Sequence, residues 1–213
     1  MPLSAWPEVM GWQIVMVALL GCYLPWRLGF EFLDAGVVVV YGCLAALFVA
    51  PRITRRLGAE QERRVLEVRR EAPERGVLRR EVGKAAVGGW GAALLLVGMG
   101  LVTVNITQWH GRVLLPPAAV LASVVVWSGS VAVLTSAVGA RMALEARSAA
   151  EASRALRGRI LLLLLAGFLA ARLLPGEWRE WFDAQMTPGR LARDVAVASA
   201  GLWAWSVALV RKY

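Results

Sequence analysis

The chain has 213 residues, of which 58% are hydrophobic, and its mean hydropathy is +0.57. Soluble domains contain about 45–50% apolar residues, so this composition excludes an ordinary soluble globular domain. The 24 Lys and Arg residues outnumber the 15 Asp and Glu residues and give a net charge of +9, so the apolar and the basic character must occupy different parts of the chain.

Six apolar runs follow one another along the chain, and we interpret each as a transmembrane helix. The third and fourth are long enough for the roughly 20 residues that a spanning helix needs. The fifth and sixth have about 16 residues each and reach about 24 Å, less than the hydrocarbon core of about 30 Å. The sequence therefore predicts an all-α, polytopic membrane protein with about six transmembrane helices. The six runs are residues 9–26, 35–50, 85–106, 113–138, 160–175 and 195–210.

The first run is expected to be a retained helix. No Lys or Arg precedes it and no small-x-small cleavage pattern leads from it into a soluble domain, so it does not resemble a cleaved signal peptide. We predict a single membrane domain over residues 1–213, built from the three hairpins 9–50, 85–138 and 160–210. Residues 176–193 are expected to be an interfacial segment on the outer face, with a turn at Thr187, Pro188 and Gly189.

The basic residues predict the orientation of the helices. Eighteen of the 24 lie at the C-terminus or in the connectors 51–84 and 139–159. Cytoplasmic loops carry an excess of Lys and Arg, so we predict that both termini and both connectors are cytoplasmic and that the protein lies in the inner membrane. The six on the other side are Arg27, Arg112, Arg172, Arg179, Arg190 and Arg193.

The first connector carries paired arginines and is expected to be helical, with a break at Pro73 and Gly76. The second is rich in Ala and is expected to be helical too, continuing the fourth membrane helix. The arginines of the first connector either contact anionic lipid head groups or dock a protein partner. A nucleic-acid surface is disfavoured, because no aromatic residues are interleaved with the charges. The candidate docking residues are Arg55, Arg56, Arg63, Arg64, Arg69 and Arg70.

Residues that could carry chemistry are few. His110 is the only histidine, and Cys22 and Cys43 lie in apolar runs, where we expect free thiols. There is no HExxH motif, and the sequence around Ser128 lacks the leading glycine of a nucleophile elbow. We therefore predict no catalytic residue, no metal site and no cofactor. No Asp, Glu, Lys or Arg lies in the middle of an apolar run, which disfavours a proton-coupled carrier.

Small residues are predicted to mediate helix packing, because they let helix backbones approach closely and their hydroxyls can hydrogen-bond between helices. The third run contributes glycines that indicate tight packing or self-association, namely Gly88, Gly91, Gly98 and Gly100. The fourth contributes Ser123, Ser128, Ser130, Thr135 and Ser136. Most tryptophans lie at the ends of the runs, as in the aromatic belts of membrane proteins.

This layout resembles that of the six-helix permease subunits of ABC exporters of the type-two class. The shared features are cytoplasmic termini, six spans, a charged connector after the second span and an amphipathic element between the last two. The resemblance implies that residues 52–84 dock on a separate cytoplasmic ATPase, that residues 176–189 form the outer helical element, and that the protein dimerises. Two alternatives stay open: a non-catalytic structural or assembly subunit of a larger membrane complex, and an intramembrane lipid-modifying enzyme.

Overall fold

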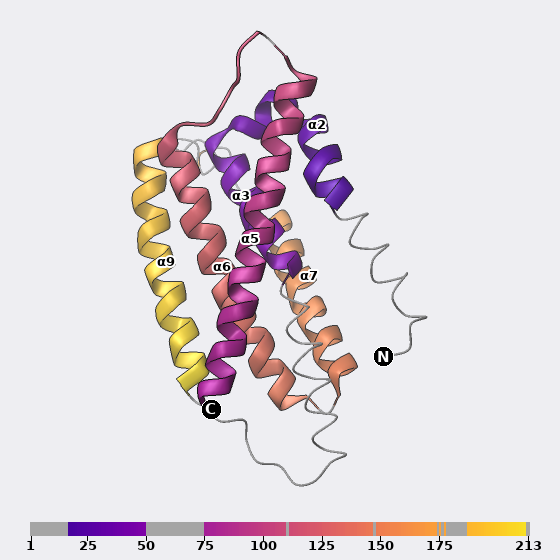
Figure 1. Ribbon diagram of the computed structural model, residues 1–213, viewed down its shortest axis with the longest axis vertical. Coiled ribbons are helices and arrows are strands. Elements are labelled where there is room, and N and C mark those ends of the chain that lie inside the picture. The colour runs from indigo at the N-terminus through magenta and orange to yellow at the C-terminus, as the bar shows by residue number, and fades with distance from the viewer. Residues whose placement is uncertain are drawn as a thin grey trace.

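The structure is a computed structural model, and it describes residues 17–49, 75–109, 111–146, 148–173, 175, 177 and 187–211. Within these ranges most of the backbone is helical and none of it is a β-strand, so the prediction of an all-α fold is confirmed. The long helices run roughly along the vertical axis of Figure 1. Two of them contain stretches long and apolar enough to cross a membrane, Val82–Thr107 and Ala118–Glu145.

The described chain begins with an irregular helical segment. A π-helix, η2 (Leu19–Tyr23), passes into the short α2 (Leu24–Leu28), and a 3₁₀ turn, η3 (Gly29–Leu33), leads the chain back into α3 (Ala35–Val49). Gly29 permits this reversal, because its φ of 55° is in a region that L side chains rarely adopt. The bounds of α3 agree closely with the predicted run 35–50, although its apolar stretch is shorter than those of the two long helices.

Helix α5 (Arg75–Thr107) is much longer than the apolar run that predicts it. It begins at Arg75 and not at residue 85, so the end of the first connector and the third apolar run form one continuous helix. Gly76 lies inside α5, and the predicted division of the first connector near it stays a prediction. Pro73 lies outside the described residues.

Helix α6 (Ala118–Glu145) begins and ends later than the predicted run 113–138. Pro117 precedes it and lacks a backbone N–H, which favours a helix start at Ala118. An ion pair between Arg141 Nε and Glu145 Oε1, 2.7 Å apart, supports the last turn. Ala146 then adopts an extended conformation, with ψ of 150°, and ends the helix. The second connector is therefore divided and does not form one helix throughout.

Helices α7 (Ala149–Leu173) and α9 (Pro188–Arg211) complete the bundle. The Ser148 hydroxyl accepts the Glu151 N–H at 3.2 Å, as an N-cap does at the start of a helix. The predicted turn at Thr187–Gly189 is wrong: Pro188 is the first residue of α9, a position that suits its fixed φ and missing N–H. The remainder of the predicted interfacial segment is almost entirely outside the described residues.

Helix α6 is the centre of the bundle and contacts α3, α5, α7 and α9 (Figure 1). Helix α5 also packs on α3 and on the irregular segment. Among the described residues, α7 and α9 make their main contacts with α6, so the pairing of residues 160–210 as a hairpin stays a prediction. The buried residues are mostly small, which lets the helices pack closely. They include Val38, Ala45, Ala93, Val104, Val120 and Val124.

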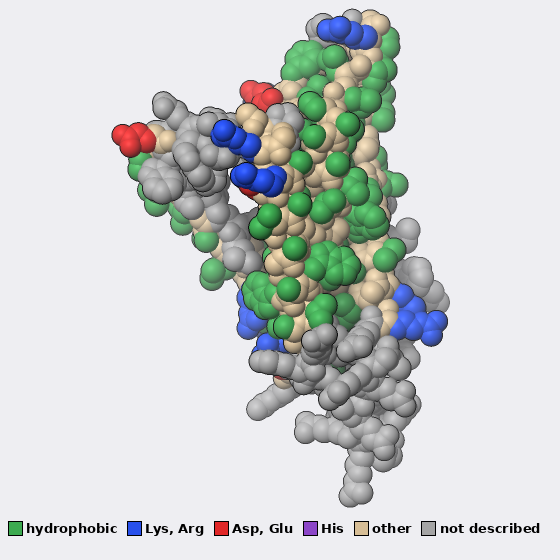
Figure 2. All heavy atoms as spheres, turned by 90° about the vertical axis from the view of Figure 1, so that its left-hand side faces the viewer, with side chains coloured by type: hydrophobic (Ala, Val, Ile, Leu, Met, Phe, Trp, Pro, Cys, Tyr) green, Lys and Arg blue, Asp and Glu red, His purple; other side chains and the backbone are tan. Residues whose placement is uncertain are grey.

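The outer surface of the bundle is strongly apolar along its length. Large hydrophobic side chains are exposed on every long helix, and Figure 2 shows them between groups of charged side chains toward the two ends. Soluble monomers rarely expose contiguous apolar patches beyond a few hundred Å². Examples are Val40 on α3; Val87, Leu95 and Val102 on α5; Leu161, Leu162 and Leu165 on α7; and Val197, Trp203 and Trp205 on α9.

Candidate functional site

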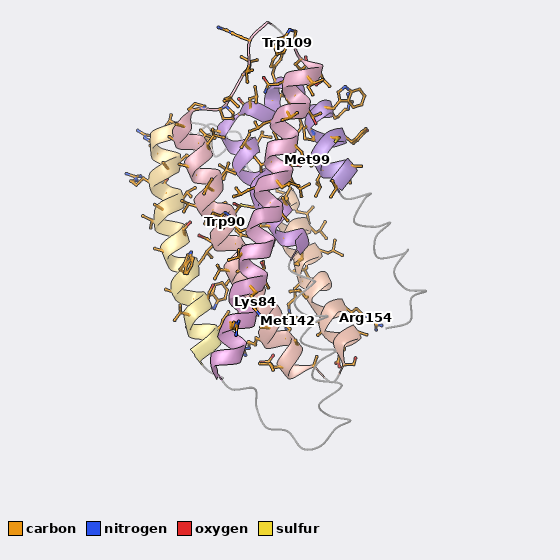
Figure 3. The ribbon with its side chains drawn as sticks, in the orientation of Figure 1. Lys84, Trp90, Met99, Trp109, Met142 and Arg154 are labelled. Carbon is orange, nitrogen blue, oxygen red and sulfur yellow. The ribbon has the colours of Figure 1, made fainter. Side chains whose placement is uncertain are left out.

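The six candidate docking arginines all lie between residues 50 and 74, outside the described residues. The structure does describe the residues that follow them, where the connector enters α5. Arg80 and Lys84 are exposed there, and Lys84 and Arg154 lie toward the same end of the bundle in Figure 3. Trp109 lies at the opposite end.

The four candidate packing glycines of α5 divide into two groups. Gly100 packs tightly, since a Cβ there would lie 2.6 Å from Phe32 Cζ and 3.0 Å from Pro25 Cγ. Gly88, Gly91 and Gly98 are exposed, and a Cβ on any of them would meet nothing within 4 Å. Of these four glycines, Gly100 therefore packs against another element, whereas the other three contact none of the described residues, and for them packing or self-association stays a prediction.

Three other glycines make close contacts that the sequence did not predict. A Cβ on Gly21 would lie 2.9 Å from Met99 Cε, one on Gly42 would lie 3.1 Å from Val124 Cγ1, and one on Gly129 would lie 3.3 Å from Trp90 Nε1. Each marks a crossing between elements distant in sequence. No local pattern distinguishes these glycines from exposed ones, because the partner that each contacts is on another helix.

The irregular segment is built around a missing hydrogen-bond donor. Pro25 has no N–H, and Leu24 donates to the carbonyl of Leu19, so the carbonyls of Leu20 and Gly21 both lose a regular helical donor. Side chains from two other helices supply donors to these two carbonyls. The Tyr41 hydroxyl of α3 donates to the Leu20 carbonyl, and the Thr103 hydroxyl of α5 donates to the Gly21 carbonyl at 3.2 Å.

An aromatic pair closes this region. Phe32 is fully buried and packs edge-on against Tyr41, with ring centroids 5.0 Å apart and an interplanar angle of 78°, a favoured geometry for aromatic rings. Gly100 provides the space for the Phe32 ring on α5. The arrangement fixes the π-helix against α3 and α5. Such π-helical turns are frequent at functional sites, but here the hydrogen bonds and packing assign it a structural role.

Among the described residues, no buried hydroxyl of α6 is seen to form the interhelical hydrogen bonds that were predicted. Ser123, Ser130 and Thr135 donate to the carbonyls four residues earlier in their own helix, at 2.7–2.8 Å. This local bonding satisfies the hydroxyl without a partner helix. The predicted close approach is confirmed, since these side chains are buried. The Ser199 hydroxyl of α9 is buried and has no hydrogen-bond partner among the described residues.

Asn105, near the end of α5, holds the following loop in place. Its Nδ2 donates to the carbonyls of Leu101 and Leu114, at 2.8 and 2.9 Å, and its Oδ1 accepts the Leu114 N–H at 2.7 Å. The amide thereby pairs with both backbone groups of Leu114, as a neighbouring strand would.

Replacing Asn105 by Asp is expected to loosen this loop. The carboxylate keeps the size of the side chain but loses both N–H donors and places a negative charge beside two carbonyls. Hydrogen exchange of the peptide 108–117 should then speed up about tenfold or more, the equivalent of about 1.4 kcal/mol. Thr107→Val is the control, because the Thr107 hydroxyl bonds only to carbonyls of α5. Equal exchange in the two variants would contradict the role of Asn105.

Two further features bear on chemistry. An apolar groove of about 90 Å³ lies between the N-terminal parts of α6 and α9, beyond their first turns, and is lined by Ala122, Ser123, Val126, Ala192, Val195 and Ala196. In the part of the chain that the structure describes, no group of three or more His, Cys, Asp or Glu residues could hold a metal ion. Cys22 and Cys43 are both free thiols.

Comparisons with protein families, with curated protein sequences and with solved structures found no match to this chain.

Proposed function

We propose that this protein is an integral inner-membrane subunit of a transport complex, resembling a permease, and that a separate cytoplasmic ATPase docks on its arginine-rich first connector. The observation that carries the proposal is the continuity of α5. One unbroken helix runs from Arg75 to Thr107, so a displacement of the connector would move a helix as long as the bundle.

Embedding in a bilayer is supported by the distribution of side chains. Exposed Val, Leu and Trp residues occupy the middle of the long helices, where water would be an unfavourable environment. Described charged residues lie toward the ends, as Arg80 and Lys84 do on α5 and as Arg190 and Arg193 do on α9. A helix that spans the hydrocarbon core with its charges in the head-group regions has this pattern.

A second candidate function is favoured by the outward side of α5. The exposed Gly88, Gly91 and Gly98 leave this side narrow, with no described residue within 4 Å of where their side chains would start. Interfaces between membrane helices are enriched in such small residues. On this alternative the chain is a non-catalytic assembly subunit, or one half of a homodimer, and another membrane helix covers α5.

Charge reversal in the connector tests the first proposal. The full-length protein purified in a mild detergent should carry a stoichiometric ATPase, and Arg63→Glu with Arg64→Glu should reduce the bound ATPase at least tenfold, because opposed charges at an interface become like charges. ATP hydrolysis stimulated by the complex should fall with it. The matched control is Arg190→Glu with Arg193→Glu. It reverses the charge of two side chains at the other end of the bundle and should leave ATPase binding unchanged.

A C-terminal reporter that is active only in the cytoplasm is measured in parallel, because reversing basic residues can also invert a membrane protein. ATPase binding that survives the Arg63 and Arg64 substitutions with the orientation intact would refute docking on the connector. Co-purification of other membrane chains without any ATPase would refute the permease proposal and support the assembly subunit.

A further inference from the structure

Four large apolar side chains are exposed at the junction of α5 and α6, and we call them the apolar tip. They are Ile106, Trp109, Val113 and Leu115, which are 71%, 64%, 64% and 61% exposed. They fall within ten residues of sequence, on the last turn of α5 and the loop that follows it. Single exposed apolar residues need no explanation, but a contiguous group marks an interaction surface.

The apolar tip projects past the rest of the bundle. In Figure 1 the loop after α5 rises beyond the first turns of α6 and α9, and Figure 3 shows Trp109 in this projecting part. The length of α5 is consistent with a projecting tip. Its apolar part, Val82–Thr107, has 26 residues and extends about 39 Å, which is more than the hydrocarbon core of about 30 Å. If the charged first turn of α9 lies in the head-group region, the apolar tip lies farther from the hydrocarbon core than the head groups do.

The tip is also ordered by the chain itself. Asn105 pairs with the N–H and the carbonyl of Leu114, so both backbone groups of this residue point toward α5. Residues 113–117 are neither helical nor in a turn, and where such a chain runs extended the backbone groups of consecutive residues point to opposite sides. No described residue pairs with the backbone of Val113 or Leu115. A short backbone edge is therefore left open beside two exposed apolar side chains.

The charge at the tip is unbalanced. Arg112 is exposed and forms no ion pair with any described residue. Residues 108–117 contain no Asp or Glu, so the loop supplies no carboxylate of its own.

We propose that the apolar tip docks a polypeptide segment of another protein, and that this segment carries apolar side chains and a carboxylate for Arg112. The segment pairs with the open edge at Val113 and Leu115, which is strand addition in its shortest form. Because the loop is already held by Asn105, docking costs little ordering of the loop. A lipid surface fits less well, because the tip rises beyond the charged residues of α9. The proposal rests on the membrane location stated above and not on ATPase docking.

Cysteine labelling tests the proposal whatever protein supplies the docked segment. In the background Cys22→Ala and Cys43→Ala, Leu115→Cys is treated with a membrane-impermeant maleimide in native membranes and in nanodiscs made with lipid from those membranes and holding one copy of the chain. We expect at least tenfold slower labelling in native membranes than in nanodiscs. Arg112→Glu should restore fast labelling in native membranes, and Arg112→Lys should not.

Two controls make the outcomes distinct. Val40→Cys, on an exposed apolar position of α3, should stay unlabelled in both preparations, and labelling there would contradict the membrane location and not the tip. Arg190→Cys should label in both.

Slow labelling of Leu115→Cys in both preparations would show that lipid covers the tip, and fast labelling in both would show that nothing does. Protection in nanodiscs that hold two copies would identify the occupant as a second copy. Each of these three results overturns the proposal. Protection of Leu115→Cys that is unchanged by Arg112→Glu would refute the proposed pairing of Arg112 with a carboxylate of the docked segment.

Discussion

Gly100→Ala is expected to destabilise the bundle by about 1–3 kcal/mol, the cost of overpacking a filled core. The added Cβ would lie 2.6 Å from Cζ and 3.0 Å from Cε1 of Phe32, and 3.0 Å from Cγ of Pro25. Phe32 cannot move aside easily, because it is fully buried and packs against Tyr41. The measurement is the free energy of unfolding in mixed micelles titrated with a denaturing detergent.

Gly98→Ala is the matched control for this experiment. Gly98 lies two residues earlier on α5, and a Cβ there would meet nothing within 4 Å. Alanine is the better helix former by up to about 1 kcal/mol, so the control should be as stable as the native protein or more stable. If both substitutions changed stability equally, the contact between α5 and the irregular segment would be refuted. If Gly98→Ala instead abolished self-association, the outward side of α5 would be an interface between copies.

Gly29→Ala is expected to cost about 1–3 kcal/mol through backbone strain alone. The backbone at Gly29 has φ of 55° and ψ of −127°, which an L residue cannot adopt without strain. Space is not the limitation, because the atom nearest to an added Cβ, Gln108 Nε2, would be at an ordinary 3.5 Å. Thermal unfolding in detergent measures the effect, which should appear as a lowered midpoint.

The control for Gly29 is Gly158→Ala in α7. Gly158 is exposed, has no positive φ and has no neighbour within 4 Å of where its Cβ would lie. Its replacement should leave the unfolding midpoint unchanged or raise it slightly. A Gly29→Ala protein that unfolds at the same temperature as this control would show that the reversal between α2 and α3 does not need a glycine.

The predicted boundaries agreed most closely at α3, which is Ala35–Val49 against residues 35–50, and at the end of α7, which is Leu173 against residue 175. They failed where a helix continued into polar sequence. Arg75 to Lys84 is helical although it is charged, because a backbone that is already helical extends at little cost through good helix formers. Hydropathy reports the apolar part of such a helix and not its end.

The packing residues show a similar limit. The glycines of α5 stand out as a group in the sequence, yet of the four candidates Gly100 alone contacts another element among the described residues, and nothing described lies within 4 Å of a Cβ on Gly88, Gly91 or Gly98. Composition indicates that a helix is narrow, but the side that meets a neighbour depends on where that neighbour packs. The same reasoning applies to the hydroxyls of α6, which bond within their own helix.

The sequence by itself determined the helical class and the separation of apolar from charged residues, because both follow from the order of side chains along the chain. The tertiary structure alone decided which side chains supply the donors that the irregular segment lacks. Pro25 removes a hydrogen bond locally, but Tyr41 and Thr103 come from α3 and α5 to replace it. Such pairings depend on distances across the bundle, and those distances exist only when the helices have packed.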